Sequence, residues 1–290
     1  MSIDLDKIVA IDVHTHAEVG VTGEDGLRPE WRAAAAKYFG EEATPTVEDV
    51  AAYYRERNMA AVVFTVDAVT QTGRPAVRND EIAEVAAANA DVLIPFGSVD
   101  PHRPDAVDEV RRLVAEHDIR GFKFHPNIQA FFPNDEAFYP LYEAIQEAGV
   151  PALFHTGHSG IGTGLPGGGG IRLKFSNPMY VDDVAVDFPE MKIVLAHPSF
   201  PWQDEAISVA LHKRQVYIDL SGWSPKYFPP QLVRYANTQL RDRVLFGSDY
   251  PMITPDRWLK DFERLEIDDE VRPLVLKENA ARLLGLRGEP

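Results

Sequence analysis

Eight short apolar segments alternate with helical patterns along this chain of 290 residues, and this alternation limits the folds open to it. The segments expected as strands are residues 8–14, 60–66, 92–99, 119–125, 150–155, 192–197, 215–220 and 243–249. The patterns expected as helices are residues 46–58, 79–90, 104–117, 136–148, 178–187, 203–213, 230–240, 256–265 and 271–286. Such an alternation predicts an α/β fold, a (β/α)₈ TIM barrel, with residues 1–290 forming a single domain.

A doubly wound open sheet is the rival fold. Such sheets usually have fewer strands and a glycine-rich turn after the first one. Here the first strand instead runs into His14, Thr15 and His16, so the barrel is favoured.

Two segments are long for loops, residues 17–45 after the first strand and residues 156–177 after the fifth. In a barrel both would lie at the carboxyl ends of the strands, where loops build active sites. Residues 157–170 contain many glycines but lack the Gly-Lys-Ser/Thr ending of a phosphate-binding loop. We expect them to act as a lid or to approach a ligand through their backbone.

Charge and composition exclude several classes of partner. The formal net charge is −16, which argues against binding to nucleic acid or to an anionic membrane. The chain has no Cys, so any metal must be bound by His and carboxylate ligands. The chain also lacks a leader-like N-terminus and a long apolar run. We therefore expect a cytoplasmic protein with a small-molecule substrate, and a homodimer as the commonest assembly.

Residues suited to metal chemistry stand at the ends of the expected strands. His14 and His16 end the first strand and share a face, His155 ends the fifth, His197 the sixth and Asp249 the eighth. A lone His-x-His pair is frequent by chance, but five such residues at one barrel mouth favour a site. His14, His16, His155 and Asp249 make a set of three nitrogens and one oxygen. That set suits one divalent ion, Zn²⁺ first, with Mn²⁺, Fe²⁺ and Co²⁺ as alternatives.

The segments around these residues resemble the amidohydrolase superfamily. They are IDVHTH (11–16), GFKFHP (121–126), PALFHTG (151–157), IVLAHPS (193–199) and LFGSDYP (245–251). Within the superfamily they are most similar to its second family, the relatives of aminocarboxymuconate-semialdehyde decarboxylase. Four longer segments, residues 51–68, 149–178, 199–206 and 219–238, resemble more narrowly a group described as 4-hydroxyphenyl-β-ketoacyl-CoA hydrolases.

The resemblance implies roles for the residues at the strand ends. His14, His16, His155 and Asp249 match the metal ligands, and His197 matches the catalytic histidine, with Asp249 also orienting a water. It implies a metal-dependent hydrolase in which metal-bound hydroxide cleaves an aromatic β-ketoacyl thioester and His197 acts as acid/base. Some decarboxylases of the family have Glu-x-His in the first motif. The His-x-His of this chain leaves open the alternative, a nonoxidative decarboxylase of an aromatic or muconate-type carboxylate.

Further residues are candidates for substrate binding. Lys123 and His125 share a face of the fourth strand. Lys123 either binds a substrate oxygen or, as in binuclear amidohydrolases, is carboxylated and bridges a second metal. Arg172 could meet an anionic group, and Trp202 and Trp223 could line an aryl pocket. For Arg172 the simpler alternative is an exposed cation, and for each Trp it is packing.

Overall fold

The strands predicted by the alternation form a closed barrel in a computed structural model that describes residues 3–40 and 43–287. The strands within these residues are β1 (Ala10–His16), β2 (Met59–Phe64), β3 (Leu93–Pro95), β4 (Phe122–Phe124), β5 (Ala152–His155), β6 (Ile193–Ala196), β7 (Val216–Asp219) and β8 (Val244–Leu245). All neighbouring strands are parallel, in the orders β1-β2-β3 and β4-β5-β6-β7-β8. Single parallel bridges join Gly97 to Phe122 and Thr15 to Tyr250, and these close the sheet. The predicted TIM barrel is therefore confirmed.

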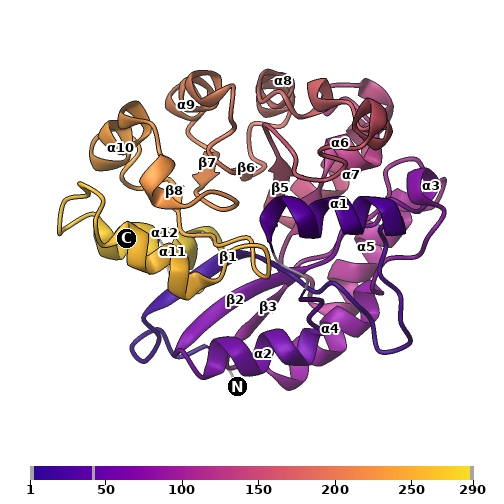
Figure 1. Cartoon of the computed structure of the whole chain (residues 1–290), viewed down its shortest axis with the longest axis horizontal. Coiled ribbons are helices and arrows are strands. Elements are labelled where there is room, and N and C mark those ends of the chain that lie inside the picture. Colours follow the sequence, from indigo (N-terminus) through magenta and orange to yellow (C-terminus); the bar gives the residue numbers. More distant parts are fainter. Residues whose placement is uncertain (1–2, 41–42, 288–290) are drawn as a thin grey trace.

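Helices surround the strands, as Figure 1 shows. Those that follow the expected patterns are α2 (Val47–Arg55), α4 (Asn79–Ala88), α5 (Ala106–His117), α7 (Tyr139–Ala148), α8 (Met179–Asp187), α9 (Gln203–His212), α10 (Pro230–Asn237) and α11 (Pro255–Phe262). The expected helix 271–286 is shorter, a π-helical turn at Leu274–Glu278 followed by α12 (Asn279–Leu283). Among the described helices, none combines the length and the apolar character needed to cross a bilayer.

The first long loop contains a helix that the apolar pattern did not predict. Helix α1 (Pro29–Phe39) starts with a proline in its first turn and ends at Gly40, which has a φ of 70°. Trp31 is buried, and its indole N–H donates to the carbonyl of Gly169 at 3.0 Å. Helix α1 is thereby attached to the glycine-rich segment after β5, and two long loops form one cover.

Alternate residues of the strands face two different apolar clusters. In β5 and β6, Leu153 and Val194 belong to one cluster, whereas Phe154 and Leu195 belong to the other, which packs under the helices. The register of β1 shifts between Asp12 and Thr15. Such a bulge re-aims side chains and is frequent beside active sites.

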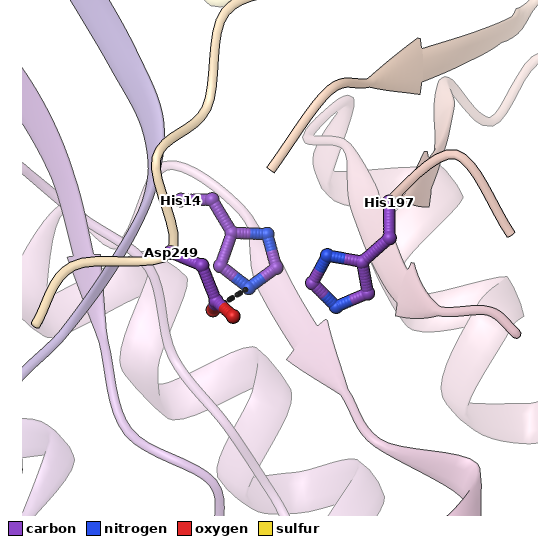
Figure 2. A group of neighbouring side chains, drawn as sticks. All are labelled: His14, His197 and Asp249. Carbon is purple, nitrogen blue, oxygen red and sulfur yellow. Dashed lines mark ion pairs between the residues drawn. The ribbon is translucent and has the colours of Figure 1, made fainter. Parts of the chain in front are cut away.

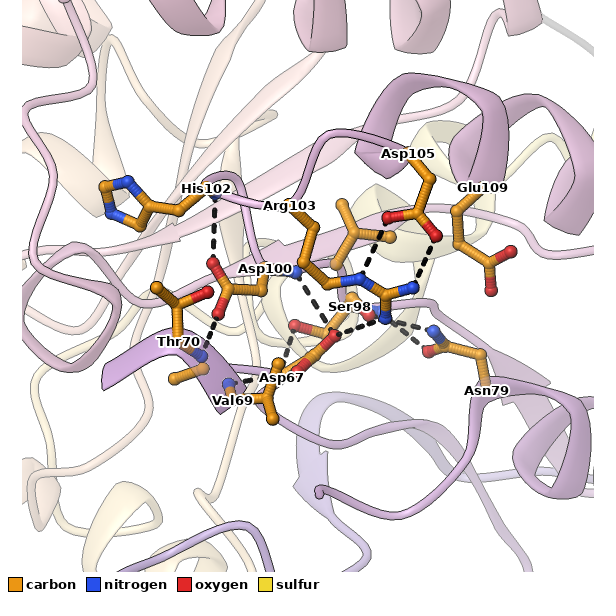
Figure 3. Close-up of polar contacts among 12 residues, drawn as sticks. Asp67, Val69, Thr70, Asn79, Ser98, Asp100, His102, Arg103, Asp105 and Glu109 are labelled. Atoms are coloured by element: carbon orange, nitrogen blue, oxygen red, sulfur yellow. Dashed lines mark hydrogen bonds and ion pairs between the residues drawn. The ribbon is translucent and has the colours of Figure 1, made fainter. Parts of the chain in front are cut away.

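A polar network joins the loops after β2 and β3 (Figure 3), and Gln129 connects it to the segment after β4. The Asp67 carboxylate accepts from the backbone N–H of Asp100, and Arg103 lies 3.8 Å from it. The side chain of Gln129 accepts from the backbone N–H of His125 at 2.8 Å and donates to the carbonyl of Asp67 at 2.7 Å. Gln129 therefore fixes the backbone of a residue at the barrel mouth.

Replacing Gln129 by leucine is expected to lower the free energy of unfolding by about 2–4 kcal/mol, because buried backbone groups lose their partners. Urea denaturation measures this change. Gln239→Leu, at an exposed position, is the control, and an equal effect of both substitutions would contradict the assignment.

Candidate metal centre

Three buried side chains converge at the carboxyl ends of β1, β6 and β8. His14, His197 and Asp249 each offer one ligand atom, and these atoms lie within 4.8 Å of one another. Figure 2 shows the two rings and the carboxylate turned toward a common point. Ligand atoms around a tetrahedral ion with bonds near 2.1 Å lie about 3.5 Å apart. Small side-chain movements would therefore bring the three ligand atoms to the spacing that a bound ion requires.

His16 adds a fourth donor to this group. Its Nε2 lies 3.2 Å from Oδ1 of Asp249, and the same oxygen lies 3.3 Å from Nε2 of His14. Asp249 thus lies between the two imidazoles of the His-x-His pair. The pair and the carboxylate form a compact donor set of the type that binds Zn²⁺ or Mn²⁺.

His14 is oriented by the end of β7. Its Nδ1 donates to the buried carboxylate of Asp219 at 2.8 Å. Because the proton is on Nδ1, the lone pair of Nε2 faces Asp249 and the Nζ of Lys123, which lies 3.1 Å away. Carboxylates that hold a ligand histidine in this way are usual partners of metal sites.

His155 and His125 stack beside the trio. Their ring centroids are 3.9 Å apart with an interplanar angle of 9°. Nδ1 of His155 lies 2.9 Å from Nε2 of His197. Nε2 of His155 is buried and has no hydrogen-bond partner among the residues that the structure describes. A buried imidazole nitrogen without a partner is unusual and fits a group that is held for a ligand.

Burial dominates the electrostatics of the cluster. It lowers the pKa values of His14 and His155 well below the usual range, and it also lowers the pKa of His197. These rings are therefore neutral at pH 7, the form that binds metal. Burial lowers the pKa of Lys123 to about 8. For Asp249, burial acts to raise the pKa, but the hydrogen bond with His16 and the neighbouring histidines outweigh it and lower it.

Two site residues have an unusual backbone conformation. His197 has a φ of 77° and Asp249 a φ of 72°, in the left-handed region that non-glycine residues rarely adopt. Gly222 packs against His197, and a Cβ there would lie 2.6 Å from the ring Nδ1. The backbone at the ends of β6 and β8 is thus held in strained geometry that aims both side chains inward.

A cavity of about 460 Å³ opens above the donor cluster. Helix α1 contributes much of its cover through Arg32, Ala33, Ala36, Tyr38 and Phe39. The wall is thus largely apolar, and the polar groups converge at its base, as is typical of small-molecule sites.

Most of the predicted site residues line this cavity: His14, His16, Lys123, His125, His155, His197, Trp223 and Asp249. Trp202 and Arg172 are not among the described residues that line the cavity. Trp202 is the N-cap of α9. Arg172 is exposed after the glycine run, so the structure does not place either of them for the expected substrate contact.

Sequence reasoning missed Ser221. Its Oγ lies 2.9 Å from Nδ1 of His14 and also 2.9 Å from Nδ1 of His197. The sequence signal was its position two residues after Asp219, beyond the end of the seventh strand. Ser221 joins the proposed ligand histidine to the proposed catalytic histidine.

Replacing Ser221 by alanine is expected to weaken metal binding by about tenfold to 100-fold, because partners of ligand imidazoles have effects of this size. Competition with a chromogenic chelator measures the affinity for Mn²⁺. Ser208→Ala, at an exposed position of α9, is the matched control. An unchanged affinity in the Ser221 variant would show that the hydroxyl is dispensable.

Among known protein families, the model described as Amidohydrolase matches residues 11–286 of this chain. No curated protein matches the chain. A solved structure of an uncharacterized TIM-barrel protein from Bordetella bronchiseptica is 25% identical with a TM-score of 0.77, covering 95% of this chain and 98% of that chain.

Two further solved structures share the fold. One is 5-carboxyvanillate decarboxylase from Sphingomonas paucimobilis, at 18% identity and a TM-score of 0.66, covering 96% of this chain and 99% of that chain. The other is a dihydroxybenzoic acid decarboxylase from Polaromonas sp. JS666 with bound manganese and an inhibitor, at 16% identity and a TM-score of 0.67, covering 97% of this chain and 98% of that chain. At these identities the likeness concerns the fold alone.

Proposed function

Because this chain belongs to the amidohydrolase family, we propose that it is a metal-dependent enzyme that decarboxylates an aromatic carboxylate without an oxidant. The observation that carries the proposal is the donor cluster of His14, His16 and Asp249 at the base of a largely apolar cavity. Moving a carboxylate from water into such a cavity favours loss of its charge as CO₂. The two decarboxylases that share the fold support this choice.

The donor chemistry fits a divalent ion, since imidazoles and a carboxylate are bound by Zn²⁺ and by Mn²⁺. When bound, the ion would supply Lewis-acid stabilisation of the substrate oxygens. His14, His16 and Asp249 would hold it, with His155 as the further ligand that the resemblance implies. Manganese is the first ion to test, because one of the structurally similar decarboxylases contains it.

The protein's own groups perform the remaining steps. Lys123 lies at the base of the cavity beside His14, where its ammonium form attracts the substrate carboxylate. The neutral imidazole of His197 first takes up a proton, from solvent or from a hydroxyl of the substrate, and the resulting imidazolium delivers it to the ring carbon that carries the carboxylate. The bond between that carbon and the carboxylate then breaks, its electrons return to the ring, and CO₂ leaves. The apolar cover of α1 excludes bulk water during these steps.

Hydrolysis of an aromatic β-ketoacyl thioester is the second candidate. The cavity volume of about 460 Å³ favours this larger substrate, because a cavity of about 150 Å³ is already enough for a benzene ring alone. In that reaction water adds to the keto carbon, the carbon–carbon bond breaks, and the leaving carbon takes a proton from His197.

The products distinguish the two reactions. The manganese-loaded protein is incubated with a panel of hydroxylated benzoates and, separately, with aromatic β-ketoacyl thioesters. Release of CO₂ from a benzoate with formation of the corresponding phenol supports the decarboxylase. Release of acetyl-CoA and an aromatic acid from a thioester, without CO₂, would replace it by the hydrolase.

A further inference from the structure

Aromatic rings form a continuous arc around the cavity above the metal centre. Tyr38 contacts Phe39 at a centroid distance of 4.9 Å and His158 at 6.0 Å. His158 lies 6.4 Å from Phe200, which lies 5.5 Å from Trp223. We call these five residues the aromatic arc. Its members come from α1 and from the loops after β5, β6 and β7, so it spans much of the barrel mouth.

The arc borders the cavity and also reaches solvent. Tyr38, Phe39, His158 and Trp223 line the cavity. Tyr38 is 46% exposed and Phe200 is 45% exposed, whereas His14 and His197 at the base are buried. Exposed aromatic side chains that continue a ligand cavity are typical of binding surfaces. The arc is therefore the outer part of the same cavity, and the donor cluster is its base.

His158 is the polar member of the arc, and its backbone is firmly held. Its N–H donates to the carbonyl of Phe200 at 2.6 Å. The preceding Gly157 has a φ of 90°, and a Cβ there would lie 2.7 Å from the backbone of Ser199. The loops after β5 and β6 thus pack backbone to backbone, a close approach that requires this glycine.

The ring of His158 has no hydrogen-bond partner among residues 3–40 and 43–287. Burial lowers the pKa of His158, so the imidazole is neutral at pH 7. A neutral imidazole has one donor and one acceptor nitrogen. Within the described residues neither nitrogen has a hydrogen-bond partner, so both are placed to meet a ligand beside the aromatic rings of the arc.

We propose that the aromatic arc is a distal subsite for an aromatic ring of the substrate, and that His158 selects rings with a hydrogen-bonding substituent. This inference rests on the proposed function, in which the reacting carboxylate or carbonyl end lies at the metal centre. In the proposed decarboxylation the ring that carries the carboxylate lies at the base of the cavity, so the arc holds a second, substituted ring of the substrate at the mouth. The volume of about 460 Å³ accommodates both rings.

The test uses two probes that differ by one hydroxyl, 3-phenylpropanoate and 3-(4-hydroxyphenyl)propanoate. Calorimetry gives the Kd of each for the manganese-loaded protein. One additional hydrogen bond in the subsite predicts tighter binding of the hydroxylated probe by about fivefold to tenfold. His158→Phe keeps a ring but removes both nitrogens, so it is expected to abolish this preference while it still binds 3-phenylpropanoate. His212→Phe, at an exposed position of α9, is the control and retains the preference.

Equal Kd values for the two probes in the unmodified protein would overturn the role of His158. A preference that survives in His158→Phe would do the same, and failure of both probes to bind would overturn the subsite. Thermal melting of the variant verifies that it is folded. The decarboxylation assay is separate. A protein that shows the expected preference but releases no CO₂ would contradict the proposed function and leave the subsite in place.

Discussion

Replacing Asp249 by asparagine is expected to weaken metal binding by more than about 100-fold and to lower turnover by about 1000-fold or more. The carboxylate lies between Nε2 of His14 and Nε2 of His16, and a loss of its charge leaves a weak neutral ligand. Replacing a residue that hydrogen-bonds to a ligand already weakens metal binding by about tenfold to 100-fold. Loss of a ligand itself therefore has a larger effect. The Lewis-acid contribution of a bound ion is several kcal/mol, which corresponds to about three orders of magnitude in rate.

Asparagine is the suitable replacement because residue 249 has a φ of 72°, which asparagine and aspartate tolerate better than other residues. The measurements are the metal content after dialysis against Mn²⁺ and the rate of CO₂ release from the best benzoate of the panel. Asp242→Asn, at an exposed position, is the matched control. An Asp249→Asn protein that keeps one ion per chain with unchanged affinity would show that the carboxylate is not a ligand.

The alternation of strand and helix patterns predicted the barrel because each strand is a short, strongly apolar segment. The side of the barrel on which the strands end was predictable for the same reason, so His14, His155, His197 and Asp249 could be expected at one mouth. The exact ends were not, since β8 stops at Leu245 rather than at residue 249.

Helix α1 shows why the cover of the cavity was not predictable. Four consecutive alanines, Ala33–Ala36, give no apolar period, and the helix is stabilised by distant contacts. Trp31 bonds the carbonyl of Gly169, and Phe39 packs where a Cβ of Gly160 would lie 2.5 Å from its ring. Such contacts depend on two loops meeting in space, which the sequence pattern does not contain.

The spacing of the donor atoms could not be predicted from the sequence either. The sequence and the family resemblance assign His155 to the metal and His197 to acid/base chemistry. The structure places His197 in the tightest trio, with His155 next to it. Strand-end positions determine which side chains reach the mouth, but not which nitrogen each ring presents. That choice depends on partners such as Asp219 and Ser221, whose positions follow from the closed sheet.

Replacing His197 by asparagine therefore separates the two roles. We expect turnover to fall by about 100-fold to 10,000-fold, the usual contribution of a general acid or base. The metal content should stay at that of the unmodified protein, because His14, His16 and Asp249 remain to bind the ion. Asparagine again suits the backbone, since residue 197 has a φ of 77°.

Two measurements on the same His197→Asn sample decide the assignment, the metal content per chain and the rate of CO₂ release. His212→Asn, at an exposed position, controls for the loss of a histidine elsewhere. Loss of the ion together with activity would make His197 a ligand, as its place in the trio allows. Full turnover with the ion retained would exclude both roles. A lower rate with unchanged metal content in a folded protein is the result expected of a proton donor that lies next to the ion without binding it.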